Sequence, residues 1–276
     1  MVEQLFRLSK AEQDELKRLL ERTSLAAVVK ATSQVTDRLR FLAGLRTLVF
    51  EPDVRKVVKE RSELHKILER EAWIFGEQYA PMVSDQSLDA VLKRHLEALG
   101  HDVSIAELQP VRREDGGVGI IDLLLGRASR GKNGREHLIV ELKAPKVKIG
   151  QKEVSQIKEY AEAVIGDPQF TDPRVSWDFW IVSTELSPIV QQDADSPKTP
   201  PGCIVEWENN VKIWAKTWSK LIDECEARLH YYRECLDYDA ASDDALDYLR
   251  RLHGDVLPFS LREEQPIAGD GETNDQ

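Results

Sequence analysis

The chain has 276 residues, of which 32% are charged and 41% hydrophobic, and its formal net charge is −11. A chain of this length can bury a sizeable core, and one main domain with helical additions fits it better than two equal domains. It has no run of about eighteen apolar residues and no charged N-terminal region followed by an apolar stretch, so we expect neither a transmembrane span nor a secretory signal.

The cysteines and histidines give no metal-ligand pattern. Cys203, Cys225 and Cys235 are odd in number and show no Cys-x-x-Cys spacing, and the six histidines are scattered along the chain. This pattern supports neither a zinc site nor a disulfide framework, and a reducing, cytoplasmic setting is the simplest interpretation.

The first 55 residues are helical in pattern and carry no catalytic residue types. Ser9 and Glu12 have the spacing of a capping box that opens a helix through about Glu21, and Ser24 can cap a longer helix that Pro52 ends. The second helix has a broad apolar face. We predict that residues 1–55 form an interaction or oligomerisation region, and that the protein is a homo-oligomer through its helical regions.

The next segment, residues 56–210, is predicted to be the core domain. Its opening helix is expected over about 56–71 and carries Glu63, and a second amphipathic helix is expected over 87–99, closing at Gly100. A strand near 103–108 is predicted to lead the central sheet.

Two apolar segments then carry charged residues inside strand-like patterns. Residues 119–126 contain Asp122, and residues 137–143 contain Glu141 and Lys143. A charge inside such a segment is costly unless it is paired or binds a metal. Side chains alternate along a strand, so Glu141 and Lys143 share one face, and a hairpin of the two strands would bring Asp122 to the same point. Two carboxylates suit Mg²⁺ or Mn²⁺, and an ammonium group beside them can stabilise a phosphoryl transition state.

The element that follows, residues 152–165, has the pattern of a helix with one buried stripe. Gln156 and Tyr160 lie four residues apart on one flank of this helix. Taken alone, either residue is more often helix surface than part of a site.

The C-terminal part is predicted to hold a strand over 177–183, a flexible loop over 191–202, an edge strand over 203–207 and a helix over 212–236. Residues 211–257 are expected to form C-terminal helices, and residues 258–276 an acidic, disordered tail. Trp214, Trp218 and Tyr231 could stack single-stranded bases, but their helical spacing favours packing in the core.

The order of these features resembles the PD-(D/E)XK nuclease superfamily: a helix with Glu63, a strand with Asp122, a strand with Glu141-x-Lys143, and a helix with Gln156-x-x-x-Tyr160. From Glu63 to about residue 207, the chain is most similar to the Shedu-like nuclease domains of bacterial anti-phage systems. It departs from the motif in one respect, because Ile121 and not proline precedes Asp122.

The resemblance implies an α/β fold, with a restriction-endonuclease-like mixed central sheet flanked by helices. It also implies a metal-dependent nuclease that hydrolyses DNA, with RNA as the less expected substrate. Asp122, Glu141 and Glu63 would hold Mg²⁺ or Mn²⁺, Lys143 would act in catalysis, and Gln156 and Tyr160 would complete the site. An ATPase or another protein of such a defence system is the implied partner.

Most of the net negative charge lies in the last 43 residues of the sequence, whereas the segment around the predicted site is basic. Residues 234–276 hold 12 acidic against 3 basic side chains, a balance of −9, whereas residues 127–152 hold 8 basic against 2 acidic ones, a balance of +6. A phosphate backbone would be drawn to the basic segment. Lys146 and Lys148, just after the site strand, are the better candidates for backbone contacts. Arg130 and Lys132 lie in a turn-rich stretch that could equally be a solvated loop.

Two other functions remain open at this stage. The chain could be a catalytically silent nuclease-fold module that binds nucleic acid or a partner protein, since the same core occurs in such relatives. It could also be an effector that its N-terminal helices or its assembly hold inactive.

Overall fold

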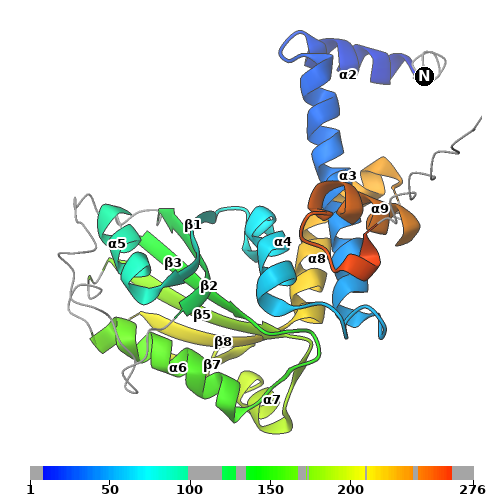
Figure 1. Ribbon diagram of the computed structural model, residues 1–276. Helices are drawn as coiled ribbons and strands as arrows, with labels where there is room; N and C mark the ends of the chain where they lie inside the picture. The colour runs from blue at the N-terminus through cyan, green and yellow to red at the C-terminus, as the bar shows by residue number, and fades with distance from the viewer. Residues whose placement is uncertain are drawn as a thin grey trace, which may run out of the picture.

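The computed structural model describes residues 9–98, 120–128, 135–166, 172, 174–208, 210–238 and 242–262. Their centre is a mixed six-stranded sheet in the order β1-β2-β3-β5-β8-β7 (Figure 1). The three pairs β1–β2, β2–β3 and β7–β8 are antiparallel, and β3, β5 and β8 run parallel. The strands are β1 (Ala80–Ser87), β2 (Ile120–Ala128), β3 (Arg135–Leu142), β5 (Val175–Ser183), β7 (Cys203–Trp207) and β8 (Val211–Thr217). A small parallel pair joins β4 (Lys148–Ile149) to β6 (Glu185–Leu186).

Helices cover both faces of this sheet, which explains why its central strands are apolar on both sides. Leu123 and Leu124, neighbours on β2, are both fully buried but belong to different hydrophobic clusters. The first cluster packs under α3 (Leu25–Phe50), α4 (His65–Arg70), α8 (Trp218–Leu236) and α9 (Ser242–His253). The second packs under α5 (Leu88–Ala98), α6 (Gln151–Gly166) and α7 (Pro188–Ala194). The predicted α/β fold, a mixed sheet flanked by helices, is therefore confirmed.

The N-terminal helices begin where their capping residues predict. Ser9 and Glu12 form the capping box of α2 (Lys10–Leu20), and the Ser24 side chain accepts a hydrogen bond from the N–H of Ala27 at the start of α3. None of the residues of α2 is buried, and those of α3 become buried only from Leu39 onward. Figure 1 shows α2 and the first half of α3 extending away from the sheet. The interaction role of this region stays a prediction.

Three predicted elements are wrong in their type or extent. The helix expected over 56–71 is a turn followed by a π-helical segment, η1 (Glu60–Leu64), which continues into α4. The helix expected from Lys212 starts only at Trp218, because Val211, Ile213 and Ala215 alternate into the core as strand β8. The loop expected over 191–202 begins inside a helix, α7, with proline at its first turn.

Other expectations are confirmed or lie outside the described residues. The strands expected over 177–183 and 203–207 correspond to β5 and β7, and the helices over 87–99 and 152–165 to α5 and α6. Strand β1 was not expected, because its sequence contains proline and no apolar alternation. The strand expected over 103–108 and residues 263–276 of the tail lie outside the described residues.

The three aromatic residues considered for base stacking lie in different environments. Trp218 is fully buried in the core, whereas 70% of Tyr231 is exposed. Trp214 is partly buried, and its Nε1 donates to Asp178 Oδ1 at 2.7 Å. Core packing therefore explains Trp218, and the three residues do not share one surface.

In the described part of the chain, no helix is long and apolar enough to cross a membrane.

Candidate active site

Asp122 and Glu141 are brought together by the register of β2 and β3. Leu123 pairs with Val140 in this antiparallel ladder, so the residues one step outward, Asp122 and Glu141, face each other across the two strands. Both carboxylates are buried, each residue being only 2% exposed. The N–H of Leu142 donates to Asp122 Oδ2 at 2.7 Å and fixes this carboxylate against β3.

Lys143 follows the last residue of β3 and completes a closed group of hydrogen bonds. Its Nζ lies 2.8 Å from Glu141 Oε1 and donates to Gln156 Oε1 at 3.0 Å. The Gln156 side chain donates in turn to Glu141 Oε1 at 2.8 Å. The backbone N–H of Lys143 donates to the carbonyl of Val182 at 2.9 Å, so its backbone is still held by β5. Three side chains thus fix one another's positions.

Tyr160 links the hydrogen-bonded group of Lys143, Glu141 and Gln156 to the first residue of β2. Gln156 Nε2 donates to the Tyr160 hydroxyl at 3.2 Å, and that hydroxyl donates to the carbonyl of Ile120 at 3.0 Å. Tyr160 is buried, one turn of α6 beyond Gln156. Its contacts are therefore those of a positioning residue, which connects α6 to the strand that carries Asp122.

The third carboxylate of the cluster is Glu60, which the sequence analysis missed in favour of Glu63. Glu60 opens η1, and its Oε2 accepts a hydrogen bond from the N–H of Ala144, directly after Lys143, at 2.9 Å. The Glu63 carboxylate instead accepts from the N–H of Lys59 at 2.7 Å, as a residue of a first helical turn commonly does. Among the described residues, the group that could hold a metal ion therefore contains Glu60 in place of the predicted Glu63. No pattern in the sequence distinguishes the two residues, and η1 begins four residues later than the predicted helix.

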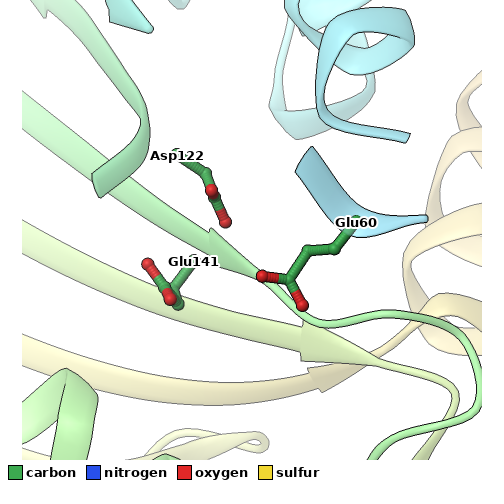
Figure 2. Close-up of side chains that lie close together, drawn as sticks. All are labelled: Glu60, Asp122 and Glu141. Atoms are coloured by element: carbon green, nitrogen blue, oxygen red, sulfur yellow. The ribbon is translucent and has the colours of Figure 1, made fainter. Parts of the chain in front are cut away.

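The three carboxylates form a group that could hold a metal ion. One ligand oxygen each from Glu60, Asp122 and Glu141 can be chosen so that all three lie within 4.8 Å of one another. Figure 2 shows the three side chains converging from η1, β2 and β3. An all-oxygen, all-carboxylate set of this kind fits hard divalent ions such as Mg²⁺ or Mn²⁺ better than soft ions such as Cu⁺.

The charges in this group are poorly balanced without a cation. Burial, followed by the charge of Glu141, raises the pKa of Asp122 to about 8, although the Leu142 N–H opposes the shift. Burial alone would lower the pKa of Lys143, but the charge and hydrogen bond of Glu141 outweigh it, so this pKa is raised. One ammonium group therefore faces three carboxyl groups, and a bound divalent cation would favour the ionised form of Asp122.

The predicted nucleic-acid contacts are only partly within the described residues. Lys146 and Lys148 are exposed just beyond the site, and Lys148 Nζ lies 3.9 Å from a Glu185 carboxylate oxygen. Arg130 and Lys132 lie outside the described residues. The role of all four in nucleic-acid binding stays a prediction.

We expect Glu60→Gln to weaken Mn²⁺ binding by about 10-fold or more, because the change removes one of three charged ligands. Glu63→Gln, three residues along the same segment, is the matched control and should leave the affinity within about twofold. Isothermal titration calorimetry on the full chain measures both. If only the Glu63 variant loses affinity, the third metal ligand is Glu63 and not Glu60.

Comparisons of the chain with protein-family models, with curated proteins and with solved structures found no match.

Proposed function

We propose that the protein is a metal-dependent nuclease of the PD-(D/E)XK type, which hydrolyses phosphodiester bonds of DNA with Mg²⁺ or Mn²⁺. One observation carries the proposal: three buried carboxylates that could hold a metal lie beside a lysine whose ammonium group is fixed by Glu141 and Gln156. A structural ion pair would need only Lys143 and one carboxylate, and the additional acidic groups raise the free energy of the metal-free protein.

A bound Mg²⁺ or Mn²⁺ would lower the pKa of a coordinated water and offset negative charge on the phosphate. Glu60, Asp122 and Glu141 would supply its protein ligands. Lys143 Nζ would donate to the attacking water or to a phosphate oxygen, where negative charge grows in the transition state. Because the ammonium group is positioned in advance, little reorganisation is needed at the moment of reaction.

Gln156 and Tyr160 would act by holding Lys143 in place. The Gln156 carbonyl oxygen accepts from Lys143 while its amide group donates both to Glu141 and to Tyr160. Neither residue needs to touch the substrate in this arrangement. Their loss would misdirect the ammonium group, and a small misplacement of a catalytic group can cost a large factor in rate.

The remaining parts of the proposal follow from the resemblance and the charge pattern. DNA would approach over Lys146 and Lys148, with Arg130 and Lys132 as further contacts, and RNA is the other candidate substrate. Self-association of the protein would use its helical regions, above all residues 1–55, in which α2 has no buried residue. The biological role would be that of the nuclease effector of a Shedu-like anti-phage system, with an ATPase or another defence protein as partner.

A cleavage assay tests this proposal. The full chain is incubated with supercoiled, linear and single-stranded DNA and with RNA, in Mg²⁺, Mn²⁺ or EDTA, beside Glu141→Ala. We expect metal-dependent cutting by the wild type and none by the variant, since Glu141 contributes both a ligand and the partner of Lys143.

Two other outcomes would count against the proposal. Cutting that persists in EDTA, or in Glu141→Ala, would place the activity elsewhere. Metal binding and nucleic-acid binding without cutting on any substrate would make the chain a silent nuclease-fold binding module.

A further inference from the structure

A cavity of about 400 Å³ lies along β1, the terminal strand of the sheet, between α4 and α5. Figure 1 shows β1 running between these two helices. Small-molecule sites have volumes of roughly 300–1,000 Å³, so this one is large enough for a single ligand group. Its lining comes from three elements and consists of Glu69, Met82, Ser84, Gln86, Ala90, Lys93 and Arg94.

The strand register places β1, which lines this cavity, next to the strand that carries Asp122. Ser84 pairs with Leu123 and Gln86 with Ile121, so the two lining residues flank the position on β1 that lies opposite Asp122. Neighbouring strands are separated by only about 5 Å. The strand that lines the cavity and the strand that carries Asp122 are thus neighbours in the sheet.

The lining combines the kinds of contact that a nucleotide needs. Lys93 and Arg94 offer cationic donors for a phosphate group, and the Arg94 guanidinium can form two parallel bonds to it. Met82 and Ala90 provide apolar surface for a sugar or a base. Gln86, which is exposed, has an amide that can both donate to and accept from the edge of a base.

The charges that face the cavity are not all positive. Lys93 Nζ lies 3.6 Å from Glu97 Oε1, and Arg94 Nη1 lies 2.9 Å from Glu97 Oε2, so a single carboxylate is shared by both cations. Glu69 contributes a negative charge from α4 across the cavity. Two cations and two carboxylates thus lie at the cavity, and Glu97 orients the cations along one side of α5.

From this juxtaposition we infer that the cavity is a subsite for one unpaired nucleotide of the strand that is cut, with its phosphate on Lys93 and Arg94. The inference rests on the proposed function and deepens it. A base that occupies a cavity cannot remain stacked and paired in a duplex. The preferred substrate is therefore single-stranded nucleic acid, or a duplex with a frayed or unpaired segment next to the cleavage point.

The test compares two Lys-Arg pairs, each on a helix of the full chain. Lys93→Ala/Arg94→Ala removes the pair at the cavity, and Lys17→Ala/Arg18→Ala removes the same dipeptide and the same charge from α2. Binding of a labelled short single strand and of its duplex is measured by fluorescence anisotropy in EDTA, where no cutting occurs.

We expect the wild type to bind the single strand more tightly than the duplex. The cavity variant should lose about 10-fold in affinity for the single strand, and the α2 variant less than about twofold. Glu97→Gln should change the affinity in the opposite direction, by about two- to fivefold, because it releases the two cations.

Equal losses in both double variants, or wild-type preference for the duplex, would overturn the subsite. Because binding is measured without metal, the two proposals can fail separately. Binding that depends on Lys93 and Arg94 in a protein that cuts nothing would keep the nucleotide-binding site and overturn the nuclease. Metal-dependent cutting that neither double variant affects would support the nuclease and overturn the subsite.

Discussion

Lys143→Met should lower the rate of DNA cleavage by about 10³-fold or more while leaving metal binding intact. The group that could hold a metal ion consists of Glu60, Asp122 and Glu141, so the variant keeps all three carboxylates. The Lys143 Nζ lies next to this group, 2.8 Å from Glu141 Oε1. Removal of one preorganised donor from a transition state typically costs a factor of about 10²–10³ in rate, and a charged donor in a buried site costs more. Single-turnover cleavage at saturating Mg²⁺ or Mn²⁺ measures the rate, and calorimetry measures the metal affinity.

Lys216 provides a matched control for this experiment. It is 8% exposed, as is Lys143, and its Nζ pairs with Glu224 Oε2 at 3.1 Å on the other side of the sheet. Lys216→Met also removes the ion pair of a buried lysine, so it tests the effect of such a loss on folding, and it should retain cleavage within about threefold. If both variants lose activity equally, the effect belongs to folding, and the catalytic role of Lys143 is wrong.

Asp122→Asn should stabilise the metal-free protein near pH 8 by an amount on the order of a few kcal/mol. The pKa of Asp122 is raised from 3.8 to about 8 in the folded state, mainly by burial. Between these two values the unfolded chain has lost the proton and the folded chain keeps it, so the free energy of unfolding falls as pH rises from about 4 to about 8. An amide at this position carries no charge, and the part of the pH dependence due to Asp122 disappears.

Urea unfolding in EDTA at about pH 5 and about pH 8 measures this difference. Saturating Mn²⁺ should flatten the pH dependence of the wild type but have no such effect on the variant. Asp178→Asn is the control, since burial also raises the pKa of Asp178, but its Oδ1 accepts from the indole N–H of Trp214 and it is not in the carboxylate cluster. If Mn²⁺ changes the pH dependence of both variants equally, Asp122 is not a ligand.

The β2–β3 half of the site could be predicted from sequence because it is local. Asp122 and Glu141 lie in paired antiparallel apolar strands, Lys143 directly follows the second of them, and the alternation of side chains predicts which of them share a face. The same holds for Gln156 and Tyr160, whose spacing on one helix puts both on one side. The repeat of side chains every two residues in a strand, or every 3.6 residues in a helix, shows directly which residues share a face.

The choice between Glu60 and Glu63 required information that no pattern in the sequence carries. Both residues lie in the first turn of η1, and which one reaches the cluster depends on where that segment begins and on its contact with Ala144. The prediction of a helix over Lys212–Thr217, where the structure has strand β8, is wrong for a similar reason. Trp214 and Trp218 are four residues apart, as in a helix, but the pairing of β8 with β5 and β7 imposes a strand.

The hydrogen bond from the N–H of Ala144 to Glu60 joins parts of the chain that are far apart in sequence, and Tyr160 closes the same group from α6. During synthesis, a nascent chain whose α6 is still inside the ribosome has its first carboxylate but lacks the positioning residues of its lysine. The assembled centre can therefore form only after translation has passed the middle of the chain. Under the proposed function, an unfinished polypeptide would carry no complete centre with which to cut nucleic acid.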